Sequence, residues 1–418
     1  MAEILKTILN EVKPSAEEES RIKEDVSKFI NSLEYSLKKL KINARVMTGG
    51  SFAKGTTIKK DRYDVDVFVV FDKKYESDRI SGMLEKALKA VKIKFDKLPG
   101  SRDYFSIERR KFKIEAVPVI GIKKPNEAKN ITDLSLLHVN YIRKKIGKNK
   151  KLGDEIRLVK AFCYANNCYG AESHIKGFSG YCLELLTSHY GSFDKLIKAA
   201  SKWKDKTVID SAGYYRKKNV MLELNEAKLF SPLILIDPVQ SDRNAAAALS
   251  KEKFDIFIDL CKKFIKKPSK ALFEKKIIDE NDIIKNAKRK KAMLIKIIAK
   301  SDKIKDDIAG AKLLKLFNLL QEKLKKEGYK TEALWDFKNK EARMWFSIKK
   351  LKKVERAGPF IEMKKHVSAF KKKYRKSFVK NKRMYALVEP KSLDDLFSVD
   401  KKQLSEMGID SYIFRKLF

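Results

Sequence analysis

The sequence predicts a large α+β protein with more than one domain, and three observations support this fold class. The chain has 418 residues, a length for which about three domains is the usual expectation. Short apolar strands mix with amphipathic helices in the first part, helices dominate the middle, and strands return towards the end. We therefore expect an α+β domain at 1–132, a mainly helical domain at 133–272 and a second α+β domain at 273–418.

The first domain is expected to begin with two helices. The segment Glu3–Val12 has helical periodicity, and Ser15 with Glu18 forms a capping box that opens a long helix to about Lys39. A further helix and five strands of one mixed sheet are expected after it. The helix is Asp78–Val91, and the strands are Ala44–Thr48, Val65–Phe71, Lys92–Asp96, Tyr104–Glu108 and Phe112–Val119.

The middle domain is expected to be mainly helical, because apolar residues recur there at helical spacing. The expected helices are Asp133–Ile146, Asp154–Asn166, Gly180–Tyr190, Ser192–Lys202 and Lys251–Lys266. Two polar interruptions break the series, at Gly170–Ser179 and after a short strand at Leu233–Ile236. Beyond the second interruption, Arg243 is expected to stand at the start of an alanine-rich helix, Asn244–Leu249.

The last domain is expected to be a ferredoxin-like sandwich with a short tail, since its elements follow the order β-α-β-β-α-β. These elements are Ala292–Ile298, Ala309–Lys326, a hairpin of Thr331–Phe337 and Arg343–Lys349, then Ile361–Tyr374 and Met384–Val388. RNA-binding modules use this fold, although the aromatic strand signature of the usual RNA-recognition type is absent. An RNA-binding role for this domain therefore rests on fold analogy.

A stretch near the start of the chain combines features of a phosphoryl-transfer site. Gly50 and Ser51 form a turn that lets the backbone approach an anionic phosphate. Asp64 and Asp66 follow, two residues apart on one strand, so both carboxylates point to the same face. Glu115 lies on a later strand of the same sheet. Oxygen ligands arranged in this way suit two Mg²⁺ ions, so the pattern favours a polymerase-type nucleotidyltransferase site.

The composition predicts a polyanionic partner. Lysine and arginine total 95 against 55 acidic residues, which gives a formal net charge of +40. Nucleic acid is the first expectation and an anionic membrane the second, although no apolar stretch is long enough to span a bilayer. The cation-rich and aromatic segment Lys371–Arg383 could follow an RNA backbone. The 4 cysteines show no zinc spacing, and with no secretory signal in the sequence we expect free thiols in a reducing, cytoplasmic setting.

Taken together, these residues resemble the archaeal (class I) CCA-adding enzymes, which are template-independent tRNA nucleotidyltransferases. The resemblance covers nearly the whole chain and is densest from Gly50 to Asp66 and in three later runs. These runs are DEIRLVKAFCYANNCYGAE from Asp154, KGFSGY from Lys176 and DPVQSDRNAAAALS from Asp237. It implies a polymerase-β-like nucleotidyltransferase head at 1–132, a helical neck at 133–272, and an α+β body with an abbreviated tail at 273–418.

The resemblance also implies roles for single residues. Asp64, Asp66 and Glu115 would hold two Mg²⁺ ions as the catalytic carboxylates. The implied contacts to the triphosphate and sugar are Ser51, Lys54, His138, Lys160 and Tyr169, beside the Gly50 turn, with Arg243 reading the base. The chain departs from the family pattern at three positions: Glu115 stands for a usual Asp, Asp64 for a frequent Glu, and Lys54 for a frequent Arg.

We therefore expect an enzyme that adds and repairs the CCA end of tRNA from CTP and ATP and releases pyrophosphate. Two alternatives stay open. One is another template-independent RNA nucleotidyltransferase, A-adding or poly(A)-forming, and the other is an RNA-binding protein with a decayed site. The expected partners are tRNA and the two nucleotides, without a membrane, and the oligomeric state is open, a homodimer included.

Overall fold

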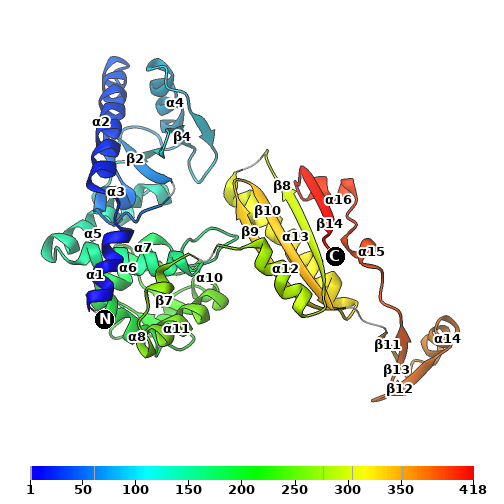
Figure 1. Ribbon diagram of the computed structural model, residues 1–418. Coiled ribbons are helices and arrows are strands. Elements are labelled where there is room, and N and C mark those ends of the chain that lie inside the picture. The colour runs from blue at the N-terminus through cyan, green and yellow to red at the C-terminus, as the bar shows by residue number, and fades with distance from the viewer. Residues whose placement is uncertain (1, 61, 276, 304, 350–352) are drawn as a thin grey trace. The chain divides into compact units, whose positions relative to one another are not determined.

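The computed structural model describes residues 2–60, 62–275, 277–303, 305–349 and 353–418. Its chain forms two compact units, Met1–Lys276 and Ile277–Phe418, which are treated separately below (Figure 1). The first unit contains the segments predicted as head and neck, and the second contains nearly all of the predicted body. The finer division at residues 132 and 272 stays a prediction.

A five-stranded sheet is the centre of the first 120 residues. Its strand order is β1-β2-β5-β4-β3, in which β2 and β5 are parallel and the other neighbours are antiparallel. The strands are β1 Ala44–Thr48, β2 Tyr63–Phe71, β3 Asp96–Leu98, β4 Tyr104–Glu108 and β5 Phe112–Ile120. The prediction placed β3 at Lys92–Asp96, which is wrong. Lys92 has a φ of +55°, so the chain turns there after helix α4 before it can extend.

Helices cover both faces of this sheet. The predicted first two helices are confirmed as α1 Ala2–Val12 and α2 Ala16–Lys39, and Ser15 and Glu18 form the capping box. Helices α2 and α4 (Ile80–Ala90) pack an apolar cluster against one face. On the other face, Phe68 and Val70 of β2 pack with Val139. Val139 belongs to α5 (Ser135–Lys148), which therefore holds its neighbour His138 near the sheet.

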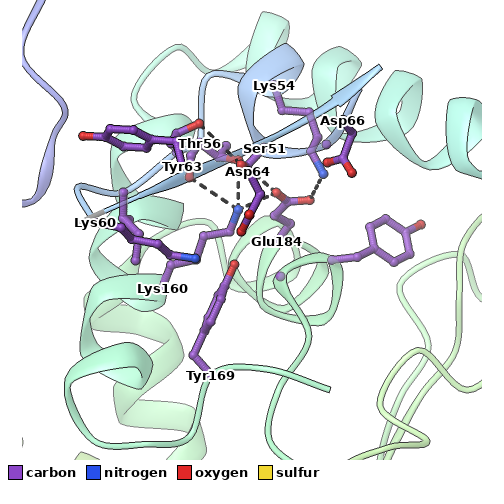
Figure 2. A pocket seen from close by; sticks show the side chains of 15 residues that line it. Ser51, Lys54, Thr56, Lys60, Tyr63, Asp64, Asp66, Lys160, Tyr169 and Glu184 are labelled. Atoms are coloured by element: carbon purple, nitrogen blue, oxygen red, sulfur yellow. Dashed lines mark hydrogen bonds and ion pairs between the residues drawn. The ribbon is translucent and has the colours of Figure 1, made fainter. Parts of the chain in front are cut away.

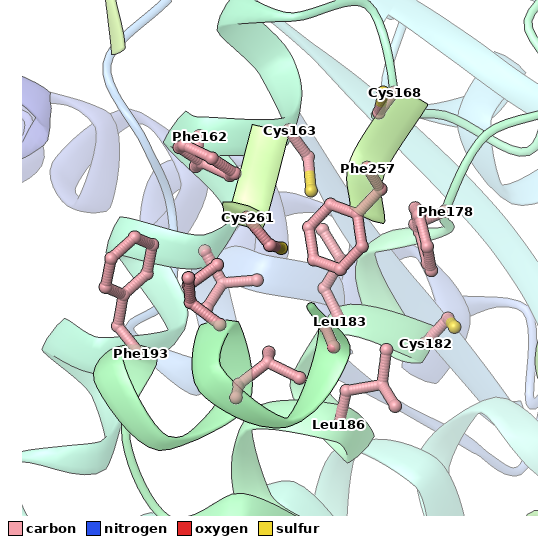
Figure 3. Packing of buried hydrophobic residues seen from close by; sticks show 14 of the residues in the cluster. Phe162, Cys163, Cys168, Phe178, Cys182, Leu183, Leu186, Phe193, Phe257 and Cys261 are labelled. Atoms are coloured by element: carbon pink, nitrogen blue, oxygen red, sulfur yellow. The ribbon is translucent and has the colours of Figure 1, made fainter. Parts of the chain in front are cut away.

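The rest of the first unit is mainly helical, as predicted. Its elements are α6 Leu152–Ala165, α7 Gly180–Tyr190, α8 Phe193–Ala200, β6 Thr207–Ile209, α9 Val220–Glu223, α10 Glu226–Leu229, β7 Leu233–Leu235 and α11 Lys251–Lys266, with short 3₁₀ turns at Pro125–Glu127, Ile131–Leu134 and Lys270–Phe273. Phenylalanine rings and the four cysteines fill its core (Figure 3). All four cysteines are buried free thiols, and burial raises the pKa of Cys168 to about 11 and that of Cys182 to about 12.

The expected helix at Asn244–Leu249 is wrong, because these residues form turns. The side-chain oxygen of Asn244 accepts hydrogen bonds from the N–H groups of Leu235 (3.0 Å) and Ala246 (2.9 Å). Its amide donates to the carbonyl groups of Lys228 (2.9 Å) and Leu233 (3.1 Å). A side chain that satisfies the nearby backbone in this way competes with a helix, despite the high helix propensity of the alanines.

The second unit contains the predicted ferredoxin-like sandwich. Its four-stranded antiparallel sheet has the order β14-β8-β10-β9, made of β14 Ser411–Lys416, β8 Met293–Lys300, β10 Glu341–Lys349 and β9 Lys330–Lys338. Helices α13 (Asp306–Lys326) and α15 (Leu393–Phe397) contribute to the main core, and α12 (Glu280–Arg289) packs with Leu294 and Trp345 in a second cluster.

The predicted second helix and fourth strand of the sandwich are wrong. The predicted helix corresponds to α14 (Lys364–Lys373) and the predicted strand to β13 (Arg383–Val388). Both belong to a separate three-stranded sheet of order β11-β13-β12, with β11 Val354–Phe360 and β12 Ser377–Lys380. The short helices α15 and α16 (Lys401–Glu406) and the final strand β14 take their places instead. Among the residues described, no helix is long and apolar enough to cross a membrane.

Candidate active site

Strands β2 and β5 bring the predicted acidic residues together. In their parallel register, Asp66 is the partner of Glu115 and Asp64 is the partner of Lys113. Partners in register point to the same face of a sheet, as do residues two apart on a strand. The alternate positions Val65 and Ile114 are buried in the core. Asp64, Asp66, Lys113 and Glu115 therefore share the opposite face, beside α3 (Gly50–Lys54) and α5.

The charges on this face are strongly coupled. The Lys113 ammonium lies 2.7 Å from Glu115 Oε1 and 3.5 Å from Asp64 Oδ1. Burial, and next the charge of Glu115, raise the pKa of Asp66 to about 6. Negative charges crowded together in this way would be relieved by a bound cation. In the part of the chain described, however, no three His, Cys, Asp or Glu side chains converge as a metal site. Fitting an ion there requires Lys113 to turn away from the carboxylates.

The turn before β2 lies directly against this face. The Gly49 N–H donates to the carbonyl oxygen of Asp66 (2.8 Å), which anchors the turn on the strand. Gly50 follows with a φ of +55°, a backbone conformation that glycine adopts readily. Ser51 is half-buried in the short helix α3, and its hydroxyl accepts a 3.4 Å hydrogen bond from Thr57.

A pocket of about 250 Å³ contains most of the predicted site residues. It is lined by Gly50, Ser51, Lys54, Thr56, Thr57, Ile58, Lys60, Tyr63, Asp64, Asp66, Lys160, Tyr169, Gly180, Tyr181 and Glu184. Figure 2 shows Lys54 beside Asp66, and Lys160 and Tyr169 on the side of Asp64, around this pocket. Glu115, His138 and Arg243 are not among the lining residues.

Glu184 of α7 connects the lysines of the pocket, and the sequence interpretation missed it. Its carboxylate accepts hydrogen bonds from Lys54 (2.6 Å), Thr56 (2.9 Å) and Lys160 (2.7 Å) (Figure 2). Glu184 and Thr56 are fully buried, and Lys160 is nearly so. Burial lowers the pKa of Lys160 to about 8, although Glu184 opposes this shift. A signal was present: Glu184 interrupts the otherwise apolar run Cys182–Leu186.

His138 and Arg243 meet at a second buried acid, Asp237. Arg243 Nη1 lies 2.6 Å and His138 Nε2 lies 3.1 Å from Asp237 Oδ2, and the Tyr181 hydroxyl donates to Oδ1 (2.9 Å). Burial acts to raise the pKa of Asp237, but the hydrogen bond and charge of His138 hold it below its usual value. The His138 and Tyr181 rings are 4.4 Å apart, and the Arg243 guanidinium lies 5.8 Å from the Tyr181 ring. Tyr181, which also lines the pocket, thus links this cluster to the lysines.

Known proteins are similar to this chain over most of its length. Residues 154–274 match the family model for the second domain of tRNA nucleotidyltransferases, and residues 1–135 match that of second messenger oligonucleotide or dinucleotide synthetase domains. The CCA-adding enzyme of Nanoarchaeum equitans is 34% identical over 90% of this chain and 92% of its own. The chain belongs to the archaeal CCA-adding enzymes. The CCA-adding enzyme of Methanocaldococcus jannaschii is 30% identical over 98% of this chain and 93% of its own.

Solved structures confirm the predicted nucleotidyltransferase fold. A cytoplasmic RNA terminal U-transferase superposes with a TM-score of 0.51 at 14% identity, over 66% of this chain and 100% of that one. The Cid1 poly(U) polymerase superposes with a TM-score of 0.52 at 14% identity, over 66% of this chain and 98% of that one. At such identity the likeness shows the fold alone. As CCA-adding enzymes act on tRNA with nucleoside triphosphates, and nucleotidyltransferases generally use divalent metal ions, the predicted enzyme class is confirmed at this level.

Proposed function

We propose that this chain adds and repairs the 3′-terminal CCA of tRNA from CTP and ATP, without a template and with release of pyrophosphate. The observation that carries the proposal is one pocket that is lined both by the acids of β2 and by lysine ammonium groups. Phosphoryl transfer needs both charges: acids to hold cations and cations to hold phosphates. The relatives, which are similar over nearly their whole length, support the tRNA substrate.

Asp64, Asp66 and Glu115 are the residues that we propose as ligands of two Mg²⁺ ions. Bound there, the ions would supply charge neutralisation and activation of the primer 3′-hydroxyl. The chain's own contribution is to hold the three carboxylates on the paired strands β2 and β5. Their backbone positions are therefore fixed before substrate arrives. Positioning and charge then carry the reaction, and no dedicated protein base is required.

Lys54, Lys160, Ser51 and Tyr169, which line the same pocket, are proposed to bind the triphosphate and sugar. The ammonium groups of the lysines attract phosphate oxygens, and the two hydroxyls can donate hydrogen bonds to them. Arg243 and His138 are proposed to contact the incoming nucleotide at the Asp237 cluster. A guanidinium held by a buried carboxylate can present its remaining N–H donors to one base edge.

The net charge supports tRNA binding through the phosphate backbone. If about five to eight phosphates are neutralised, log K should fall against log salt with a slope of roughly −5 to −7. The anticodon sequence should have no effect on this affinity. A slope near zero, or equal affinity for tRNA and an unrelated single strand of the same length, would contradict this part of the proposal.

Stepwise extension of a defined tRNA tests the function directly. A tRNA transcript that lacks its last three nucleotides is incubated with Mg²⁺ and each nucleotide alone, then with CTP and ATP together. We expect CTP to be used first, ATP next, and extension to stop after the three missing nucleotides. Repeated ATP addition without CTP would indicate a poly(A)-forming enzyme instead. Tight tRNA binding without extension would indicate a decayed enzyme.

A further inference from the structure

Glu184 joins two parts of the first unit, the part that contains the five-stranded sheet and the mainly helical part that follows it. Its buried carboxylate accepts hydrogen bonds from residues of both parts. Lys54 and Thr56 belong to α3 and the turn after it, whereas Lys160 is on α6 and Glu184 on α7. Three of the hydrogen bonds between them end on the two oxygens of one carboxylate, at 2.6–2.9 Å. Glu184 is fully buried, so these contacts are shielded from water and salt.

The contacts fix the direction of the Lys160 ammonium. Its Nζ lies 2.7 Å from Glu184 Oε1, 3.0 Å from Thr56 Oγ1 and 3.4 Å from the Thr56 carbonyl oxygen. An ammonium has three N–H donors, so each has a partner inside the protein. For Lys54, the described contacts include one hydrogen bond, to Glu184, and its Nζ stands on the pocket side (Figure 2). Both lysines are therefore held in place before a nucleotide enters.

Stability alone does not account for this arrangement. Burying one carboxylate with two ammonium groups costs desolvation energy, and apolar side chains of similar volume often stabilise a core as well or better. Among Glu184, Lys54 and Lys160 one positive charge is in excess, and these residues line a pocket of about 250 Å³ together with Lys60, Asp64 and Asp66. If the two aspartates bind cations, the lysines are left complementary to a highly charged anion such as a nucleoside triphosphate.

We propose that Glu184 is a positioning residue of the triphosphate subsite, which fixes the Lys54 and Lys160 ammonium groups together at the wall of the pocket. The inference rests on the proposed function, because it takes the ligand to be a nucleoside triphosphate. Glu184 itself would not touch the nucleotide. It acts through the two lysines, whose ammonium groups it holds by hydrogen bonds.

The electrostatics predict a pH-dependent consequence. The charged groups that act on Lys160 are Glu184, which favours its ammonium form, and Lys54 and Lys60, which oppose it. The pKa of Lys160 is about 8 with Glu184 present. Without the carboxylate, burial and the other lysines would lower this pKa further. Lys160 would then lose its charge near neutral pH and regain it only in more acidic solution.

Equilibrium binding to the full-length protein tests the proposal. Glu184→Gln keeps the shape of the side chain and removes its charge, so we expect CTP and ATP affinity to fall by about tenfold or more at pH 8 and by less at pH 6. Binding of CMP and of tRNA should change less than about twofold, because neither uses the triphosphate subsite. The matched control is Glu155→Gln, a half-buried acid of the same core that accepts the Phe193 N–H (2.7 Å), which should leave all four affinities unchanged.

Two results would overturn the proposal. One is unchanged CTP affinity in Glu184→Gln at both pH values. The other is an equal loss for CTP, CMP and tRNA, as general damage to the fold would cause. If Glu184→Gln fails to fold, the double variant Glu184→Gln/Lys160→Met removes both charges of the pair and should recover thermal stability. We expect this double variant to bind CTP weakly, and wild-type CTP affinity in it would equally refute the proposal.

The outcome is separable from that of the proposed function. Wild-type protein that extends tRNA with CTP and ATP, together with a Glu184→Gln variant of normal CTP affinity, would refute only the role of Glu184. Wild-type protein that neither binds CTP nor extends tRNA would refute the proposed function.

Discussion

Gly50 lies directly against the carboxylate of Asp66, and a methyl group on its Cα would overlap the Oδ2 atom. The preceding Gly49 donates its N–H to the Asp66 carbonyl, so backbone and side chain of one residue both meet the turn. Because of this close approach, there is no room for a side chain at Gly50, between the turn and the proposed metal ligand Asp66.

We expect Gly50→Ala to abolish most activity while the protein stays folded. The added methyl group must displace either the turn or Asp66, and a shift of a catalytic group by about 1 Å can cost on the order of a hundredfold in rate. Gly55→Ala is the matched control: Gly55 also has a positive φ (+63°), but no atom lies within 4 Å of an added methyl group. Both variants carry backbone strain, so equal activities measured by tRNA extension would contradict the prediction.

The second prediction concerns the side-chain length of Glu115, the third proposed carboxylate ligand. We expect Glu115→Ala to lose on the order of a hundredfold or more in rate, since a proposed shared ligand is removed. Glu115→Asp should also lose activity, because a shorter side chain on the same β5 position no longer reaches a site built with Glu opposite Asp66. Single-turnover rates under saturating Mg²⁺ measure both effects. A fully active Glu115→Ala enzyme would remove Glu115 from the site.

The raised pKa of Asp66 predicts how stability changes with pH when divalent ions are absent. An acid with a folded-state pKa of about 6 and an ordinary value of 3.8 is protonated more readily in the folded state. It therefore favours folding at low pH, and this contribution is lost as the pH rises from about 4 to about 6. In urea unfolding, the difference in the free energy of unfolding between wild type and Asp66→Asn should change over this pH range. Parallel pH curves would contradict the assignment.

Adding Mg²⁺ should reduce this pH effect in the wild type alone. A cation that binds the charged carboxylate stabilises the folded state at higher pH. Asp66→Asn should show little change on addition of Mg²⁺, which makes it the control for non-specific salt effects.

Arg243 is expected to control nucleotide choice. Arg243→Ala should reduce C and A incorporation and relax discrimination against U, as a lost base contact is worth about 1–3 kcal/mol. The variant also leaves Asp237 without one of its partners, so a stability change is expected with it. Arg243→Lys keeps a positive charge beside Asp237 but loses the planar fork. We expect this variant to be stable and yet less selective, and unchanged selectivity in both variants would assign Arg243 a structural role.

Local patterns predicted the elements of the site but not all of its contacts. The apolar alternation around Asp64, Asp66 and Glu115 was enough to predict strands β2 and β5, and their pairing is a matter of common sheet topology. Glu184 and Asp237 were missed because partners of each are far away in sequence: Lys54 is 130 residues from Glu184, and of the Asp237 partners only Arg243 is near, whereas His138 lies on a distant helix. A single sequence does not say which buried acid faces which cation.

Two of the errors in the fold, the helix at Asn244–Leu249 and the fourth strand of the sandwich, have the same origin. Alanines at 245–248 favour a helix locally, but the Asn244 side chain takes hydrogen bonds from the neighbouring strand and sets a turn instead. In the second unit, β13 was assigned to the main sheet because it completed the expected order of elements. In the structure, however, β14, which is far from β8 in sequence, pairs with β8 and forms the edge of the main sheet.

The pairing of β14 with β8 means that the main sandwich of the second unit is complete without β11, α14, β12 and β13. In topological terms this small sheet is an insertion between β10 and β14 of a sandwich whose sheet is complete without it. Insertions of this kind can lengthen, shrink or disappear during evolution without rebuilding the framework that carries them. A change in the length of this segment would therefore leave the sheet of the sandwich, β14-β8-β10-β9, in place.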